Sequence, residues 1–269
     1  MLDDFVNPPE LLQIARHGIG RRVATPANVI VLGAGLSGLV AALELRNAGH
    51  TITVIEAQQR VGGRILTLRS PFSEGIYAEA GAMRIPAQHR LVTAYIERYG
   101  LSLRPFRSHN EDAWAFFHRE RRRLGEAMLD SSGYNAQLAE HERGKSFQDL
   151  WAETMGPVQR TLLSGDEATW QALQHKLQGC SLRDFLADLG WSEGAIEMYG
   201  LYAGFETLLH ASAIEFIREF VAELRQATYA IAGGMDQLPL ALAKELGSSI
   251  HYGRVVTALD QDAQAVSYT

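Results

Sequence analysis

The chain has 269 residues, of which 46% are apolar and 21% are charged, and its formal net charge is −6. This composition is typical of a globular protein with a full core, and the negative net charge argues against nucleic acid as a partner. Cys180 is the only cysteine, which excludes an internal disulfide.

The beginning of the chain indicates neither a signal peptide nor a membrane anchor. The first residues, MLDDFVNPPELL, carry acids and prolines where a signal peptide has basic residues and then an apolar run. No later stretch reaches the roughly 18–20 continuous apolar residues of a membrane span. We therefore expect a cytoplasmic protein with no membrane partner. Residues 9–18 (PELLQIARHG) are expected to form a helix that opens with proline and glutamate and closes with glycine.

The next stretch has the order strand, glycine turn, helix and strand. Residues 28–32 (NVIVL) form a β-branched run, typical of a strand buried on both faces. GAGLSG follows, then the helical stretch LVAALELRNAGH and the second strand TITVIE. This order predicts a parallel sheet, because parallel strands need a crossover connection.

The rest of the chain is expected to be mostly helical, with short strands. We predict a helix over 87–100, a hairpin with a charged tip over 113–124 and a mainly helical region over 145–230. The segment 229–247 (YAIAGGMDQLPLALAKELG) predicts a glycine-rich turn and a short helix. The last residues, SIHYGRVVTALDQDAQAVSYT, predict two or three strands with a turn at 260–263.

The glycine turn has the spacing of a dinucleotide-binding site. Gly33, Gly35 and Gly38 form G-x-G-x-x-G between a strand and a helix. The first glycine allows the tight turn, the second lets a pyrophosphate approach the backbone, and the third lets helix and strand pack closely. Glu56, at the end of the second strand, suits the hydroxyls of a ribose. The alternative for Glu56 is a surface acid at a strand end.

Two further segments place arginine beside small residues. Arg60-Val-Gly-Gly-Arg64 predicts a second contact to an anion, and its alternative is a plain hairpin turn. In residues 79–86 (EAGAMRIP), Arg84 follows a run of small residues. This arginine is either a surface charge after a tight bend or a fixed clamp for an anion, since a guanidinium pairs with a carboxylate through two parallel hydrogen bonds.

Together these segments resemble the L-amino acid oxidases of the FAD-dependent amine oxidase superfamily. GAGLSGL, VIEAQQRVGGR and GGMDQLPLALA are similar to the FAD segments of these enzymes. AGAMRIPAQHRLV is similar to their segment G-x-M-R-[LI]-P-x-x-H, which is the most discriminating of the four. Monoamine and polyamine oxidases share the FAD motifs but have no α-carboxylate to bind.

The resemblance implies FAD as the cofactor and assigns residues to it. Arg84 is implied to hold the substrate α-carboxylate beside the flavin. Glu219 falls where venom oxidases carry a histidine near the substrate entrance, and its alternative is a glutamate on a helix surface. The implied cofactor residues are Gly33, Ala34, Gly35, Ser37, Gly38, Glu56, Ala57, Gly63, Arg64, Gly81, Ala82, Met83, Arg84 and Val256. The alternative for Val256 is a residue of a core strand; no metal ligand and no catalytic residue is assigned.

The implied fold is α/β, a Rossmann-like FAD-binding domain with an inserted helical domain and the beginning of a mixed-sheet substrate domain. We divide the chain into five segments. They are an N-terminal helix and arm (1–26), a first FAD-binding segment (27–70), a substrate-domain segment (71–125), a helical domain (126–230) and a return to the FAD-binding domain (231–269).

The implied reaction is oxidation of an L-amino acid by dioxygen to a 2-oxo acid, ammonia and hydrogen peroxide. A flavin-dependent amino-acid 2-monooxygenase, which forms an amide, and an amine or polyamine oxidase are the alternatives. Members of the family are about twice as long as this chain. We therefore expect a second polypeptide, or a missing C-terminal half, to complete the fold, and a homodimer of the assembled unit.

Overall fold

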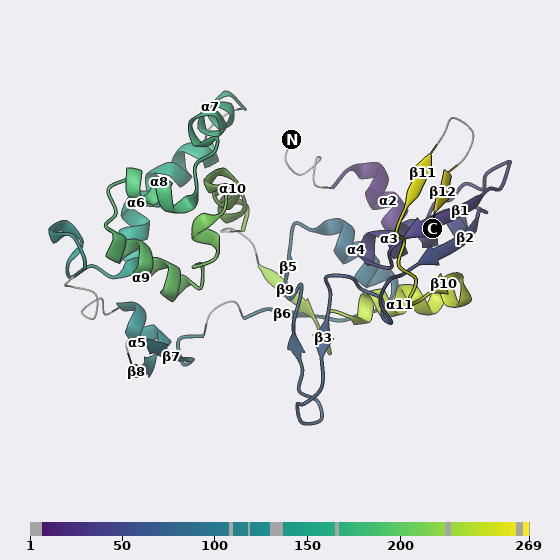
Figure 1. The fold of residues 1–269 in the computed structure, drawn as a ribbon, viewed down its shortest axis with the longest axis horizontal. Helices are drawn as coiled ribbons and strands as arrows, with labels where there is room; N and C mark the ends of the chain where they lie inside the picture. The colour runs from purple at the N-terminus through teal and green to yellow at the C-terminus, as the bar shows by residue number, and fades with distance from the viewer. Residues whose placement is uncertain are drawn as a thin grey trace. The chain divides into compact units, whose positions relative to one another are not determined.

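The chain forms two compact units, which Figure 1 shows as ribbons. The first contains residues 1–106 and 227–269, and the second contains residues 107–226. The structure is a computed structural model that describes residues 7–107, 110–117, 119–129, 137–164, 167–223, 227–261 and 266–268. Residues 107–125, which we assigned from the sequence to a substrate domain, fall in the second unit. The five-segment division remains a prediction.

A parallel sheet with helices packed on it forms the core of the first unit. Strands β1 (Asn28–Leu32) and β2 (Thr51–Ile55) are parallel, as predicted, and helix α3 (Leu36–Asn47) connects them. The short strand β10 (Ile250–His251) is parallel to β2, so that the order is β1-β2-β10. Helix α11 (Gln237–Leu246) packs against α3. The core between these elements includes the fully buried residues Leu39, Leu43, Val54 and Leu242.

The prediction that β1 is buried on both faces is wrong. Its side chains alternate between exposed and half-buried, and Ile30 and Leu32 are 42% and 46% exposed. Residues on one face of the strand meet α3, whereas Ile30 and Leu32 point to the opposite face. These two side chains therefore leave an apolar surface exposed on the strand.

Shorter elements complete the first unit. Strands β3 (Thr67–Leu68) and β4 (Ala78–Glu79) are antiparallel, and β9 (Thr228–Ile231) lies between β5 (Ile85–Pro86) and β6 (Leu103–Pro105). The helix predicted near the N-terminus is α2, and the one predicted over 87–100 is α4; these two helices pack against each other. The remaining elements of this unit are α2 (Pro9–His17), α4 (Arg90–Arg98), η4 (Gly247–Ser249), β11 (Leu259–Gln261) and β12 (Val266–Tyr268). Half of the predicted turn at 260–263 lies outside the described residues, and its first two residues belong to β11.

A buried carboxylate fixes α3 to its neighbours. Glu44, on the buried face of α3, accepts hydrogen bonds from Arg98 Nη1 at 2.6 Å, Tyr95 Oη at 3.2 Å and the Ile19 backbone N–H at 3.0 Å. Burial, and then the negative charge of Glu44, raise the pKa of the Tyr95 hydroxyl. The glycine turn lies at the N-terminus of α3, and these contacts anchor the C-terminal part of the same helix.

The second unit is a hairpin followed by helices, as predicted. Strands β7 (Trp114–Phe117) and β8 (Glu120–Arg123) form the hairpin, and Arg119 at its tip has a positive φ of 68°. A core of apolar side chains joins the helices, in which the rings of Trp151 and Tyr199 stack with centroids 4.5 Å apart. The helices are α5 (Leu124–Leu129), η2 (Glu140–Glu142), α6 (Phe147–Ser164), α7 (Glu167–Leu177), α8 (Leu182–Asp188), α9 (Glu193–Ala203), η3 (Leu208–His210) and α10 (Ala213–Glu223).

None of the helices of the described residues is both long and apolar enough to cross a bilayer. The cytoplasmic location expected from the sequence remains a prediction.

Candidate cofactor and substrate site

Each of the three positions in the first turn suits glycine for a different structural reason. Gly33 has a φ of +99°, and its N–H donates to Ile55 O at 2.7 Å. A Cβ on Gly38 would lie 2.1 Å from Gly33 O, so this position tolerates no side chain. A Cβ on Gly35 would meet nothing within 4 Å. A Cβ on Gly33 would also meet nothing within 4 Å, but Gly35 is the residue at the N-terminus of α3, which is where a pyrophosphate would approach the backbone.

The N-terminus of α3 suits an anion. Gly35 is the N-cap residue, with φ −70° and ψ 171°, and among the described residues no side chain caps this end. The first turn of α3 contains no acidic residue. Free N–H groups and the positive end of the helix dipole thus face the space over Gly35, with Ser37 exposed beside them. This arrangement fits the phosphates of a dinucleotide.

Glu56 has a second role that the sequence analysis missed. It directly follows β2, is 7% exposed, and accepts the Ala34 N–H on Oε2 and the Gln58 N–H on Oε1, both at 2.7 Å. The carboxylate therefore holds the first glycine turn against the end of β2. Each carboxylate oxygen has about two acceptor sites, so capacity remains for two ribose hydroxyls. Ala57, the next residue, is exposed.

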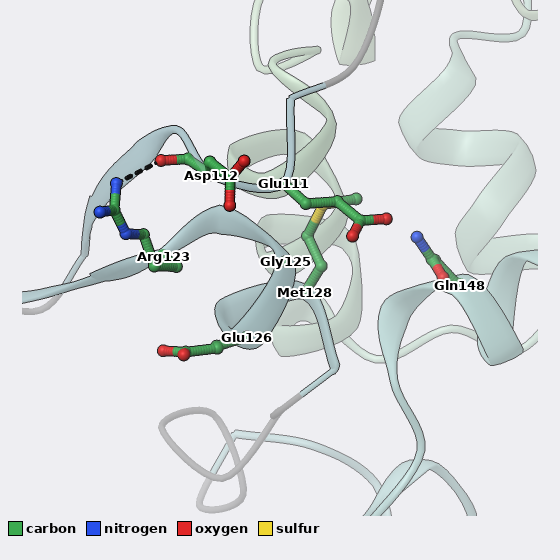
Figure 2. Close-up of a pocket in the computed structure, with 7 residues that line it drawn as sticks. All are labelled: Glu111, Asp112, Arg123, Gly125, Glu126, Met128 and Gln148. Atoms are coloured by element: carbon green, nitrogen blue, oxygen red, sulfur yellow. Dashed lines mark hydrogen bonds between the residues drawn. The ribbon is translucent and has the colours of Figure 1, made fainter.

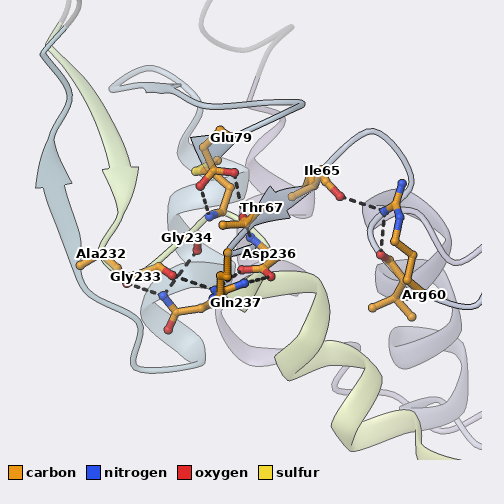
Figure 3. Close-up of polar contacts among 12 residues, drawn as sticks. Arg60, Ile65, Thr67, Glu79, Ala232, Gly233, Gly234, Asp236 and Gln237 are labelled. Carbon is orange, nitrogen blue, oxygen red and sulfur yellow. Dashed lines mark hydrogen bonds and ion pairs between the residues drawn. The ribbon is translucent and has the colours of Figure 1, made fainter. Parts of the chain in front are cut away.

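The second glycine turn lies backbone to backbone against the first. Gly62 N–H donates to Ala34 O at 2.8 Å, and a Cβ on Gly63 would lie 3.2 Å from Gly35 Cα. The two arginines of this turn differ. The Arg60 guanidinium donates to the carbonyl oxygens of Gly63, Ile65 and Val61 at 2.9, 3.1 and 3.2 Å, so Arg60 shapes its own turn (Figure 3). Arg64 is exposed and is the better candidate for an anion contact.

A short antiparallel ladder joins Arg64 to the segment before Arg84. Beyond β3 and β4, the ladder continues with Ala80 N–H to Leu66 O at 2.8 Å and Ala82 N–H to Arg64 O at 3.2 Å. A Cβ on Gly81 would lie 2.0 Å from Arg64 O, so this close pairing requires glycine. The residue predicted to contact the pyrophosphate and those predicted to line the flavin are thus parts of one unit.

The backbone on both sides holds Arg84 in place. Before it, Ala82 is in the ladder and Met83 is 46% exposed; after it, Ile85 and Pro86 are buried and pair with β9. Arg84 itself is exposed. The backbone on both sides of Arg84 is thus fixed, and its planar guanidinium has the fork geometry that a carboxylate clamp requires.

Two further predicted residues belong to other segments of the chain. Val256 is half-buried and lies between β10 and β11, so the alternative that it is a residue of a core strand does not hold. Its segment nevertheless runs beside Glu56, because Glu56 N–H donates to His251 O and Arg254 N–H donates to Glu56 O, both at 2.9 Å. Glu219 is exposed on α10 in the second unit. The roles of both residues remain predictions.

The second unit has a hollow of about 320 Å³ with an acidic rim (Figure 2). Arg123 Nη1 donates to the carbonyl oxygen of Asp112 at its edge. None of the residues predicted to bind the cofactor or the substrate lines it. The lining residues are Glu111, Asp112, Arg123, Gly125, Glu126, Met128 and Gln148.

Comparison with known proteins gives the family. The profile described as "Flavin containing amine oxidoreductase" matches residues 36–269. L-amino-acid oxidases of Vipera ammodytes ammodytes and Protobothrops flavoviridis are 36% and 35% identical over 97% of the chain. The chain spans 53% and 51% of these relatives, about half of their length.

Solved structures confirm the fold. A putrescine oxidase with two substitutions superposes with a TM-score of 0.62 at 23% identity, over 91% of this chain and 54% of its own. The wild-type enzyme bound to putrescine gives a TM-score of 0.61. The resemblance seen in the motifs is thus confirmed by sequence and by fold: the chain belongs to the flavin-containing amine oxidoreductase family.

Proposed function

We propose that this chain supplies the FAD cradle and the carboxylate clamp of an L-amino acid oxidase. The observation that supports the proposal is the ladder from Arg64 to Ala82, because Arg84 directly follows the segment that this ladder holds and that we propose to line the flavin. The relatives named L-amino-acid oxidases support the choice of substrate. The reaction would convert an L-amino acid and dioxygen to a 2-oxo acid, ammonia and hydrogen peroxide.

FAD is the cofactor, and four parts of the described chain fit it. The N-terminus of α3 and the space over Gly35 suit the pyrophosphate, with Arg64 as a second contact. Glu56 suits the ribose of the adenosine half, and Gly81–Met83 suit the flavin half. When bound, FAD supplies the acceptor for the hydride that leaves the substrate Cα.

Arg84 binds and orients the substrate in this proposal. A planar guanidinium holds a planar carboxylate through two hydrogen bonds, which restricts rotation as well as position. Holding the carboxylate in this way directs the Cα–H bond of the amino acid toward the cofactor. An amine without a carboxylate lacks this contact, so the clamp selects amino acids over simple amines.

A second polypeptide, or further chain, completes the enzyme in this proposal. The chain spans about half of its curated relatives, and no residue of this half is assigned to a proton transfer. The exposed apolar side chains of Ile30 and Leu32 support the idea, because a covering segment would bury them. A homodimer of the completed unit is the further expectation.

The test begins with the native protein. Gel analysis and intact mass should reveal a companion polypeptide, and the purified material should have a flavin absorption spectrum. A peroxide assay across the twenty amino acids should then give activity with at least one, and product analysis should find a 2-oxo acid. An amide product would instead indicate the monooxygenase. Flavin-containing material that oxidises only amines would overturn the proposal.

A further inference from the structure

A pair of polar residues lies at the centre of the ladder. Thr67 on β3 and Glu79 on β4 are directly opposite each other, and Thr67 Oγ1 donates to Glu79 Oε2 at 2.8 Å (Figure 3). Thr67 is buried, and Glu79 is half-buried. The pair therefore links the strand that follows Arg64 to the strand that precedes the flavin-lining segment.

The same pair binds the turn before α11. Glu79 Oε1 accepts the Met235 N–H at 2.8 Å, and Thr67 Oγ1 accepts the Asp236 N–H at 3.2 Å. Asp236 is the N-cap residue of α11, so the Glu79 carboxylate lies at the positive end of this helix. A Cβ on Gly234 would lie 2.8 Å from Thr67 Cγ2, which shows how closely the turn approaches the ladder.

We infer that Thr67 and Glu79 are positioning residues for the proposed carboxylate clamp. Their three hydrogen bonds join two strands and one helix terminus, so they lock the register of the ladder against α11. The outer end of that ladder carries Gly81 and Arg84. If the pairing of the two strands shifts, Arg84 moves relative to the cofactor even though Arg84 has not been substituted. The inference rests on the proposed function and adds the groups that set the clamp geometry.

Three variants separate positioning from general stability. Thr67→Val keeps the shape of the side chain and removes the hydroxyl, so Glu79 loses a donor and Asp236 N–H loses its acceptor. Thr67→Ser restores the hydroxyl. Arg69→Gln is the matched control, because Arg69 donates to both Asp236 carboxylate oxygens, at 2.7 and 2.9 Å, on the exposed side of the same turn. It breaks an ion pair there and leaves the Thr67–Glu79 pair intact.

The readout is the split between KM and kcat in the native flavoprotein, with benzoate as a simple carboxylate probe. We expect Thr67→Val to retain FAD and to raise both the KM for the amino acid and the Kd for benzoate about 10-fold or more, because a shift of about 1 Å can cost 100-fold. Thr67→Ser and Arg69→Gln should stay within about twofold of wild type. If Thr67→Val does not retain FAD, Glu79→Gln, which keeps side-chain length and one acceptor, is measured in its place.

The outcomes are distinguishable. Unchanged KM and Kd in an FAD-containing Thr67→Val or Glu79→Gln enzyme would overturn the inference and leave the proposed function standing. An Arg69→Gln enzyme with the same rise as Thr67→Val would also overturn it, since any damage to the turn would then suffice. A wild type that oxidises no L-amino acid would overturn the proposed function and the inference together.

Discussion

Gly35 and Gly38 differ by three positions, yet alanine should have opposite effects at them. A Cβ at Gly38 would lie 2.1 Å from Gly33 O, a backbone atom that cannot move without the turn. Overpacking of this kind costs about 1–3 kcal/mol, and more where backbone must shift. A Cβ at Gly35 meets nothing within 4 Å, and its φ of −70° suits alanine. Gly35→Ala should therefore leave the free energy of unfolding unchanged or raise it by about 0.4–1 kcal/mol.

The effect of Gly35→Ala on flavin content should be the opposite of its effect on stability. The methyl of Gly35→Ala would occupy the space in which the pyrophosphate meets the backbone, so the folded variant should lose FAD. Thermal unfolding and flavin absorbance after dialysis, measured on the same samples, separate the two effects. Gly35→Ala that binds FAD as tightly as wild type would refute the placement of the pyrophosphate, and Gly38→Ala with wild-type stability would refute the packing argument.

Three further predictions each concern one charged side chain, a guanidinium in the first and a carboxylate in the other two. Arg84→Ala should cost about 2–5 kcal/mol in kcat/KM for an L-amino acid, as truncation of one partner of a charge pair in a binding interface does, and near-normal kcat/KM would refute the clamp. Glu56→Gln replaces one of two acceptor oxygens by a donor, so about 1.5–3 kcal/mol of loop stability and much of the bound FAD should be lost; unchanged flavin content after dialysis would count against this role. Hydrogen bonds from the Ser181 hydroxyl and backbone N–H lower the pKa of Asp184 below 3.8, so its stabilisation is present above that pH and disappears as the pH falls through the folded pKa. Asp184→Asn should flatten the acid loss of stability in thermal melts, and an unchanged acid limb would contradict the assignment.

The glycine turn and Glu56 could be predicted because their signals are local. A β-branched run, glycines at fixed offsets and a helical stretch determine the backbone over few residues, and the structure has β1, the turn, α3 and β2 in that order. The hairpin over 113–124 followed in the same way from two short runs and a charged tip. The backbone at the candidate site residues in these segments, such as Gly35, was therefore accessible from the sequence.

The roles of Arg60 and Glu79 were not accessible, since they depend on contacts that the chain makes after folding. The sequence places Arg60 beside two glycines but does not show that its guanidinium bonds to carbonyls of its own turn. The hydrogen bond from Met235 N–H to Glu79 joins residues 156 positions apart. Such a pair has no local pattern and appears only once the strands and α11 have packed.

The prediction that β1 is buried on both faces is wrong for a different physical reason. An apolar run in a strand predicts that both faces of the strand are buried. That prediction holds only where other elements pack on both faces of the sheet. Among the described residues α3 covers one face, and Ile30 and Leu32 remain exposed on the other. An apolar run shows the composition of a strand but not which neighbours are present, so it could not reveal that this face is exposed.

Anaerobic bleaching of the native flavoprotein tests the central claim most directly. An L-amino acid and the amine formed by removing its carboxylate would be added in separate experiments, and the flavin absorbance followed without dioxygen. The clamp at Arg84 predicts rapid bleaching by the amino acid and little or none by the amine. Equal bleaching by the two compounds, or by the amine alone, would contradict it.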